Sequence, residues 1–185
     1  MQKSDCFNFP ELETDRIRIR PLTAEDAAVI YSFNSCKDSL KYIVREPYAS
    51  MEEAVNKLEN MYSAMQKKEA YWWVFELKGT GEKIGYGGLF DISKEHNRSE
   101  IGYGLLKKFW NQGYMSEIIS ELLRFGFETV QFHKIYAVVL PGNRASIKLL
   151  EHHQFEQEAL LKEHSFARGQ YFDEIIFGRL SKLDI

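Results

Sequence analysis

The sequence predicts an α+β fold in which helices cover both faces of a mixed, mostly antiparallel sheet. Segments in which apolar and polar residues alternate are interspersed with segments of helical period. Three strand-like segments also follow one another between residues 71 and 106, separated only by short turns, as antiparallel strands do. The resulting order is strand, two helices, three strands, helix, strand, helix and two strands. A layered packing around one mixed sheet is the economical arrangement for this order.

The chain opens with a strand and two helices. Residues 16–20 alternate arginine with isoleucine, which indicates a half-exposed strand. A Thr-x-x-Asp pattern then starts a helix over residues 23–33, and a Ser-x-x-Glu capping box starts a second helix over residues 50–68. Residues 34–48 between them have no regular period, so we expect an irregular connection.

The next part of the chain predicts three consecutive antiparallel strands. Residues 71–77 are aromatic and rich in β-formers, and a Gly-Thr-Gly turn at 79–81 joins them to a strand over 83–90. A turn at 96–98 leads to the third strand, residues 99–106. These segments form the predicted centre of the sheet.

The last third predicts a helix, a strand, a helix and a hairpin. Apolar residues at helical spacing indicate a helix from about residue 114 to residue 130. Residues 134–140 are nearly all apolar, which predicts a strand buried on both faces. A helix over 143–153 and two strands, 158–166 and 171–180, complete the chain.

Length, charge and cysteine content limit the function classes. The 185 residues suffice for one domain, 1–185 with a core of about 12–180, and are few for two. A net charge of −3 provides no basic field for nucleic acid or an anionic membrane. Cys6 and Cys36 form neither a disulfide framework nor a metal motif, which fits a reducing cytosol. Residues 1–5 carry no apolar run, so we expect no signal peptide and no membrane span.

A candidate anion-binding loop lies between the third central strand and the helix that begins near Tyr114. A strand, a short loop with Gly113 and an amphipathic helix direct free backbone N–H groups and a positive dipole end at one spot. A phosphate or pyrophosphate can bind there without a particular side chain. Gly113 allows a close approach or a positive φ. The alternative is a tight connection that binds nothing.

Three motifs resemble those of a known family. They are the opening Leu-Glu-Thr-Asp-Arg strand at 12–22, the segment 100–117 with its Trp-Asn-Gln-Gly-Tyr-Met-Ser-Glu run, and the Asn-Arg-Ala-Ser segment at 143–155. Together they resemble the Gcn5-related N-acetyltransferase (GNAT) superfamily, and more closely its branch of ribosomal-protein alanine and serine acetyltransferases (RimJ/RimL-like). The resemblance covers about residues 12–180.

The resemblance implies acetyl-CoA as co-substrate, no metal, and a gap between two splayed central strands, those at 99–106 and 134–140, where the cofactor lies. Its pyrophosphate would bind the main-chain N–H groups of the loop, and its pantetheine arm would pair with the exposed strand edge. A main-chain N–H near the end of that strand would polarise the thioester carbonyl. The cofactor-binding residues implied in this way are Leu105, Leu106, Gln112, Gly113, Tyr114, Met115, Ser116 and Asn143.

Two residues are candidates for proton transfer. Glu100 is the candidate general base, because related acetyltransferases carry a basic glutamate on this strand; the alternative is a solvated carboxylate. Ser146 is a candidate donor to the leaving thiolate, or a serine that bonds its own backbone. Leu150 stands where many members of the superfamily have the tyrosine that protonates the thiolate, which leaves a dedicated general acid open. Tyr103 either lines the acceptor cleft or lies in the core, and Asn143 either contacts the pantetheine arm, caps the following helix, or does both.

Other chemistries are not supported by residue spacing. His152 and His153 are adjacent and so point about 100° apart on a helix, which makes them poor joint metal ligands. The Gly-x-Gly-Gly run at 85–88 lacks the helix that a dinucleotide fingerprint requires, and suggests instead a strand crowded by a close neighbour. We therefore expect no metal site.

These observations lead to one function and two alternatives. We expect an acetyl-CoA-dependent N-acetyltransferase in the cytoplasm that acts on a primary amine, namely the N-terminal α-amine of a protein such as a ribosomal protein. The alternatives are a small-molecule amine as acceptor (a polyamine, an aminoglycoside or an amino acid) and a sensor that binds acyl-CoA without turnover. We expect no membrane or direct nucleic-acid partner, and either a monomer or a homodimer.

Overall fold

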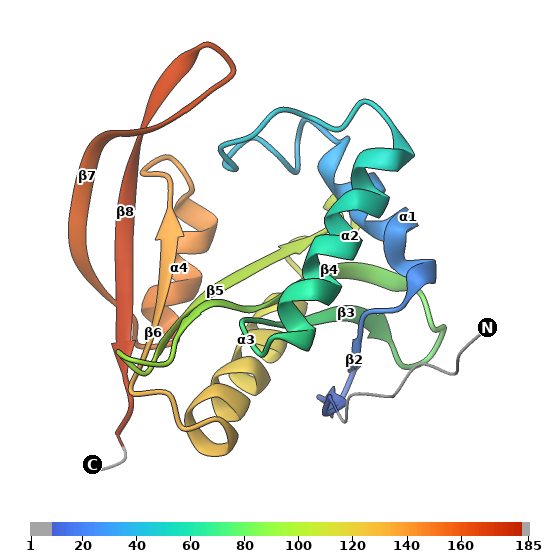
Figure 1. The fold of residues 1–185 in the computed structure, drawn as a ribbon, viewed down its shortest axis with the longest axis horizontal. Coiled ribbons are helices and arrows are strands. Elements are labelled where there is room, and N and C mark those ends of the chain that lie inside the picture. The colour runs from blue at the N-terminus through green and yellow to red at the C-terminus, as the bar shows by residue number, and fades with distance from the viewer. Residues whose placement is uncertain (1–8, 183–185) are drawn as a thin grey trace.

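One eight-stranded sheet runs through the computed structural model, which describes residues 9–182 (Figure 1). The strand order is β1-β2-β3-β4-β5-β6-β8-β7, and within the described residues only the β5–β6 pair is parallel. The mixed, mostly antiparallel sheet predicted from the sequence is confirmed. The strands are β1 (Leu12–Glu13), β2 (Ile17–Pro21), β3 (Tyr71–Leu77), β4 (Lys83–Ser93), β5 (Arg98–Leu105), β6 (Lys134–Val139), β7 (Glu156–Ala167) and β8 (Gln170–Leu180).

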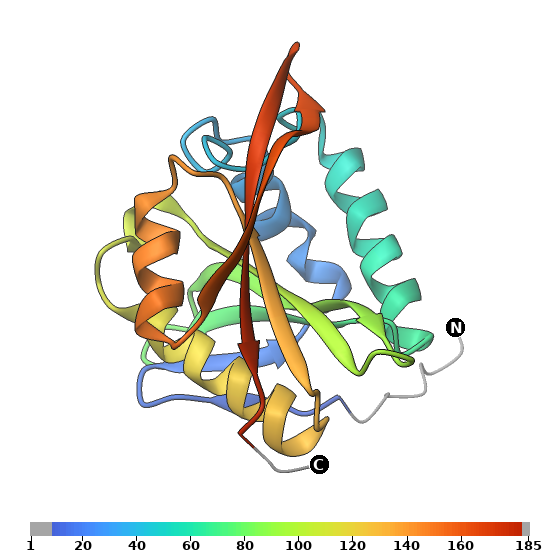
Figure 2. The ribbon, with the colours of Figure 1, turned by 90° about the vertical axis from the view of Figure 1, so that its left-hand side faces the viewer.

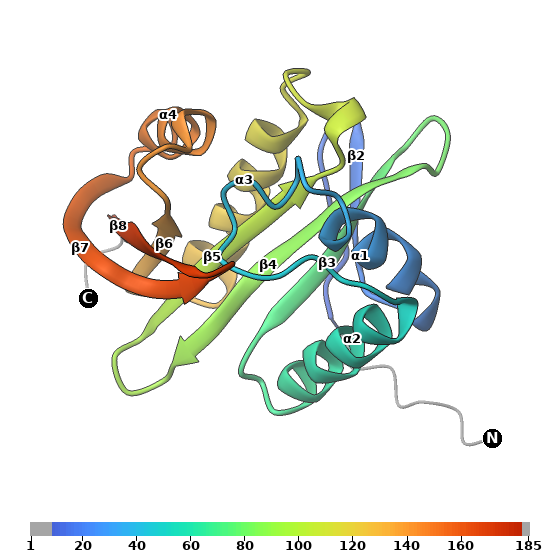
Figure 3. The same ribbon diagram turned by 90° about the horizontal axis from the view of Figure 1, so that it is seen from above.

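Four α-helices within the described residues form the outer layers. They are α1 (Ala27–Asn34), α2 (Met51–Gln66), α3 (Tyr114–Arg124) and α4 (Arg144–His152). Helices α1 and α2 cover one face of the sheet, and α3 and α4 cover the other (Figure 3). The side chains of β3 alternate between the two resulting cores: Trp73 and Phe75 pack on the α3 side, and Trp72 and Val74 pack on the α1–α2 side.

The helix starts follow the predicted chemistry. The Thr23 main-chain N–H donates to Asp26 Oδ2 at 2.7 Å, and the Ser50 N–H donates to Glu53 Oε1 at 3.2 Å, so both capping boxes form. Gly113 precedes α3 with φ of +81°, as expected of a glycine in this loop. Helix α3 then continues as a π-helical turn over Phe125–Thr129.

Two details differ from the sequence prediction. The resemblance placed residues 12–22 in one opening strand, whereas the structure has two, β1 and β2; a separate strand of two residues carries no readable period. Strand β6 was predicted to be buried on both faces, and this is wrong: Ile135, Ala137 and Val139 are buried, whereas Tyr136 and Val138 are half-buried. The half-buried face is the one that α1 and α2 leave uncovered, because these helices lie over the other half of the sheet (Figure 3).

The β7–β8 hairpin rises beyond the rest of the sheet (Figure 2). Arg168, in the turn of this hairpin, contacts the connection between α1 and α2. The Nη1 group of Arg168 donates to the carbonyl oxygens of Leu40 and Ile43 at 3.0 and 2.9 Å. The hairpin therefore holds the irregular connection between α1 and α2 in place. No helix within residues 9–182 is both long and apolar enough to cross a membrane. The expectations for Cys6 and for residues 1–5 lie outside the described residues.

Candidate active site

The central strands β5 and β6 part after a short paired region. Residues Arg98–Glu100 pair in parallel with Lys134–Tyr136, and the ladder ends there. Two adjoining cavities of about 260 and 360 Å³ lie along the parted strands and share Tyr103, Asn143 and Ser146 in their lining. Because they share these residues the two cavities adjoin, and together they are called the cleft. Its smaller part, lined by Glu100, is called the Glu100 half, and its larger part, lined by Gly113, is called the Gly113 half.

The Gly113 half ends at the loop before α3, which the sequence predicts to bind an anion. Within residues 9–182, the main-chain N–H groups of Gln112, Gly113, Tyr114 and Met115 donate to no protein acceptor. They belong to the loop and first turn of α3, where the helix dipole is positive. Ser116 differs, because its N–H donates to Gly113 O at 3.1 Å. The loop thus has a set of free donors of the kind that binds a phosphate.

Arg16 on the neighbouring segment braces this loop. Its Nη2 donates to Gln112 O at 3.0 Å, its Nε donates to Glu117 Oε1 at 2.6 Å, and its guanidinium lies 4.3 Å from the Tyr114 ring centroid. Thr14 Oγ1 donates to the other oxygen of Glu117 at 2.7 Å. Burial opposes ionisation of Glu117, but the bonds from Thr14 and Arg16 outweigh it and lower its pKa. Sequence analysis missed this brace, because its partners are about a hundred residues apart.

Ser116 and His153 join the two helices behind the loop. Ser116 Oγ lies 3.0 Å from His153 Nε2, and His153 caps the C-terminus of α4. Burial lowers the pKa of His153, which favours the neutral ring. The Ser116 hydroxyl therefore fixes α3 to α4. Within residues 9–182 no three His, Cys, Asp or Glu side chains gather as metal ligands would.

Every second residue of β5 directs its main-chain N–H and C=O groups away from β4, toward the gap between β5 and β6. Leu106 N–H donates to Ile84 O of β4 at 2.8 Å, and its carbonyl accepts from Phe109 N at 2.9 Å, so the main chain of Leu106 is engaged within the protein. Because amide directions alternate along an antiparallel strand, the N–H groups of Leu105 and Tyr103 point away from β4, toward the gap. Of the two leucines that the sequence suggested, only Leu105 offers its N–H to the cleft.

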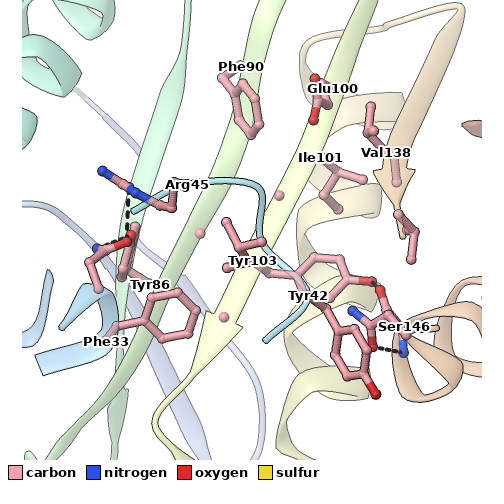
Figure 4. Close-up of a pocket in the computed structure, with 18 of the residues that line it drawn as sticks. Phe33, Tyr42, Arg45, Tyr86, Phe90, Glu100, Ile101, Tyr103, Val138 and Ser146 are labelled. Atoms are coloured by element: carbon pink, nitrogen blue, oxygen red, sulfur yellow. Dashed lines mark hydrogen bonds between the residues drawn. The ribbon is translucent and has the colours of Figure 1, made fainter. Parts of the chain in front are cut away.

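Tyr103, Ser146 and Asn143 lie where the two halves of the cleft meet. The hydroxyl groups of Tyr103 and Ser146 are 3.0 Å apart (Figure 4). Burial raises the pKa of Tyr103 to about 12, so its hydroxyl stays protonated. Asn143 Oδ1 accepts from Ser146 N at 3.2 Å and caps α4, which leaves its amide NH₂ group without a protein acceptor among the described residues. Leu150 is fully buried in the core and does not reach the cleft.

Glu100 lines the Glu100 half of the cleft. It is the last residue of β5 that pairs with β6. Burial raises its pKa to about 7, and the carboxylates of Asp91 and Glu174 act in the same direction. A carboxyl group with this pKa gains and loses a proton near neutrality, as a general base must. Its partial burial and raised pKa distinguish Glu100 from a solvated strand carboxylate.

The remaining wall of the Glu100 half is aromatic and basic. Trp72 and Phe90 stack with ring centroids 4.7 Å apart, and Arg45 and Lys57 lie on the same wall. Arg45 Nη1 donates to Asn34 Oδ1 at 3.0 Å (Figure 4). The glycines of β4 and β5 admit these rings: a Cβ on Gly88 would lie 2.9 Å from the ring of Trp72, and one on Gly102 would lie 2.7 Å from the ring of Phe90. Close neighbours within the protein thus account for the crowding that the glycines suggested.

Comparisons with known proteins agree with this geometry. Residues 16–156 match the family model described as the acetyltransferase (GNAT) domain. The chain is 32% identical over 169 residues to the uncharacterized N-acetyltransferase YoaA of Bacillus subtilis, covering 91% of this chain and 96% of that protein.

Two solved structures share the fold. One is spermidine N-acetyltransferase from Vibrio cholerae in complex with CoA and spermine, with a TM-score of 0.81, 25% identity and coverage of 91% and 97% of the two chains. The other is ribosomal-protein-S5-alanine acetyltransferase from Vibrio fischeri, with a TM-score of 0.80, 20% identity and coverage of 94% and 97%. The parted strands, the braced loop and the family match lead to one conclusion: the chain belongs to the GNAT family of acetyltransferases.

Proposed function

We propose that this acetyltransferase transfers the acetyl group of acetyl-CoA to the N-terminal α-amine of a peptide or protein. One observation carries the proposal: a single cleft runs from the free amides of the 112–115 loop to the ionisable carboxyl group of Glu100. One end suits an anionic cofactor, and the other can take a proton from an amine.

The Gly113 half fits acetyl-CoA. The free N–H groups of residues 112–115 would hold the pyrophosphate, and Arg16 braces the loop that presents them. The N–H groups of Tyr103 and Leu105 and the amide of Asn143 would pair with the pantetheine arm. Bound acetyl-CoA supplies the acetyl group as an activated thioester. The Vibrio cholerae relative was solved with CoA bound, which supports this assignment.

Glu100 would accept the proton that the attacking amine releases. An α-ammonium group has a pKa of about 8, close to the value of about 7 for Glu100, so the transfer is nearly balanced. A side-chain or polyamine ammonium with a pKa near 10.4 would make the same transfer cost about 4–5 kcal/mol. This match favours an α-amine as acceptor.

Tyr103 and Ser146 would stabilise the leaving thiolate. Attack by the amine forms the C–N bond and breaks the C–S bond, so Glu100 takes a proton from nitrogen and the sulfur, which leaves as a thiolate, takes one from solvent. Because the pKa of Tyr103 lies well above that of a thiol, its hydroxyl would donate a hydrogen bond to the sulfur and keep its own proton. The Tyr103 hydroxyl is protonated, hydrogen-bonded to Ser146 and placed between the two halves of the cleft. This pair compensates for Leu150, which occupies the family's tyrosine position, and it argues against a sensor that binds acyl-CoA without turnover.

The rival acceptor is a polyamine, which the spermidine-acetylating relative favours. The test is a panel of N-terminal peptides, spermidine and lysine-only peptides whose α-amine is blocked, with release of free CoA thiol as the readout. We expect α-amine peptides to give at least tenfold higher kcat/KM than the blocked peptides at about pH 7.5. Equal rates on blocked peptides, or a preference for spermidine, would reject an α-amine acceptor. No acceptor-dependent thiol release from any amine would reject catalysis.

A further inference from the structure

The Glu100 half of the cleft contains two cationic side chains whose charges the protein does not neutralise. Arg45 and Lys57 both line this half, and Figure 4 shows Arg45 on the side of the pocket opposite Glu100. Within residues 9–182, neither cation has a carboxylate oxygen within 4 Å. By contrast, Arg20 in the nearby core is paired with both Asp26 and Glu76.

The guanidinium of Arg45 contacts neutral side chains. It lies 4.2 Å from the centroid of the Tyr48 ring, and the single hydrogen bond that it donates within the described residues goes to Asn34. Its Nε is buried and has no acceptor. Asn34 is fixed in turn, because its Nδ2 donates to Ile30 O and to Tyr86 Oη at 2.7 and 2.8 Å. The guanidinium is therefore positioned firmly, with donors to spare.

Lys57 projects from α2 toward the same wall. Its ammonium lies 5.5 Å from the Trp72 ring centroid, and its side chain is half-buried. Burial lowers the pKa of Lys57, and the charge of Arg45 lowers it further. Two cations that repel each other and lack an anion cost folding free energy, and an anion bound between them would remove that cost.

We propose that Arg45 and Lys57 form a subsite for a carboxylate of the acceptor, so that the substrate is an amine that also carries an acidic group. The inference rests on the proposed function, because Glu100 on the opposite side takes the amine. A planar guanidinium beside an ammonium suits a carboxylate. The rings of Trp72, Phe90 and Tyr86 line the same half of the cleft, which suits an apolar stem.

The same charges select against polyamines. A polyamine that presented one amine to Glu100 would carry its further ammonium groups into a wall that already holds two unpaired cations. Unfavourable contacts of this kind set specificity as effectively as favourable ones. The carboxylate can belong to a free amino acid, to the C-terminus of a short peptide, or to an acidic side chain close to a protein N-terminus, and matched acceptors separate these sources.

The test compares acceptors that differ only in one charge. Tetrapeptides with free α-amines are made in pairs, with Asp or Asn and with Glu or Gln near the N-terminus, each as the free acid and as the C-terminal amide. Free amino acids and spermidine complete the set. We expect about tenfold higher kcat/KM for the acidic member of at least one pair, with the difference mainly in KM. Equal values within every pair, or spermidine as the best acceptor, would overturn the proposal.

Variants of Lys57 test the same point from the protein side. Lys57→Gln should reduce the kcat/KM preference for the acidic member of a peptide pair roughly tenfold. Lys57→Glu should reverse this preference in favour of the neutral or cationic acceptor. The matched control is Lys67→Gln, at an exposed position just after α2 and outside the cleft. An acidic preference that survives Lys57→Glu would contradict the subsite.

A binding measurement keeps the two proposals separable. Calorimetry of each peptide pair against the protein saturated with CoA reports the carboxylate subsite without turnover. Tighter binding of the acidic peptide, lost in Lys57→Glu, supports the subsite even if no acceptor is acetylated, in which case only the proposed function fails. Equal binding within the pairs, together with acetylation of both members, rejects the subsite and leaves the proposed function intact.

Discussion

At the residue scale, the proton that leaves the acceptor must pass to a group that is unprotonated at the working pH. Glu100 has a pKa of about 7, raised by burial and by Asp91 and Glu174, so kcat/KM should fall as pH drops below about 7. In Glu100→Gln we expect kcat/KM to be roughly 100-fold lower at neutral pH, with this limb of the pH profile removed. Glu95→Gln, on the exposed β4–β5 turn, is the charge-matched control. Full activity of Glu100→Gln across the pH range would exclude Glu100 as the base.

The raised pKa of Glu100 also has a consequence for stability. The folded protein holds this proton between about pH 4.5 and 7, whereas the unfolded chain has released it. The contribution of Glu100 to the free energy of unfolding therefore falls as pH rises through this window. At about pH 8 the free energy of unfolding of Glu100→Gln should exceed that of the wild type by roughly 1–3 kcal/mol, so the variant should melt at a higher temperature, and this advantage should be lost near pH 4.5. Thermal melts at both pH values measure it, and a pH-independent difference would contradict it.

Tyr103 is the second residue whose chemistry can be tested. Tyr103→Phe removes the hydroxyl that bonds Ser146 and keeps the ring that fills the junction of the cleft. If this hydroxyl stabilises the leaving thiolate by hydrogen bonding, kcat should fall by about 10- to 100-fold while the KM for acetyl-CoA changes little. Ser146→Ala is the companion variant, with a smaller effect expected. An unchanged kcat in Tyr103→Phe would mean that this hydroxyl does not assist the thiolate.

At the element scale, the start of α3 depends on a brace from the segment between β1 and β2. Arg16 and Thr14 fix Glu117 in the first turn, and Arg16 also holds the loop carbonyl of Gln112. Arg16→Gln should loosen the loop and raise the KM for acetyl-CoA about tenfold, with kcat nearly unchanged. Arg124→Gln, which breaks an exposed ion pair with Glu121 on the same helix, is the matched control and should leave this KM unaltered. Equal KM values in the two variants would reject the brace.

The elements that the sequence predicted well are those with a strong local signal. The capping boxes of Thr23 and Ser50 located two helix starts, and the glycine before α3 indicated the positive φ of the loop. The local pattern predicted the wrong burial for β6, because an apolar run does not reveal that α1 and α2 cover only half of the sheet. The face that a strand leaves open is a property of the tertiary packing.

The candidate site was predictable in part for the same reason. The loop at Gly113 and the strand carrying Glu100 lie in contiguous motifs, so the resemblance to a family located them. The partners that act on these residues are remote in sequence. Arg16 contacts Glu117 and Tyr103 contacts Ser146 across separations much longer than the segments from which local sequence patterns are interpreted. Arg45 lies in the irregular connection between α1 and α2, whose residues have no period to indicate that it enters the cleft.

At the scale of the whole molecule, the cleft separates two parts that are joined by the short β5–β6 ladder and by the shared core beneath α3. Strands β1–β5 with α1 and α2 form one part, and β6–β8 with α4 form the other. The Tyr103–Ser146 bond and the Arg168 contacts cross between these parts. A ligand that contacts the loop before α3, the β5 edge and Asn143 would add a further link.

Such a ligand should stabilise the fold by mass action. Acetyl-CoA at about 100 times its Kd should add about 2.7 kcal/mol to the free energy of unfolding and raise the melting temperature by several degrees. Pantetheine, which lacks the pyrophosphate, should have a much smaller effect at the same concentration, because it cannot use the free amides of residues 112–115. In Arg16→Gln the difference between the two ligands should shrink. Equal shifts from acetyl-CoA and pantetheine in the wild type would mean that these amides do not bind the pyrophosphate, because only acetyl-CoA can present one to them.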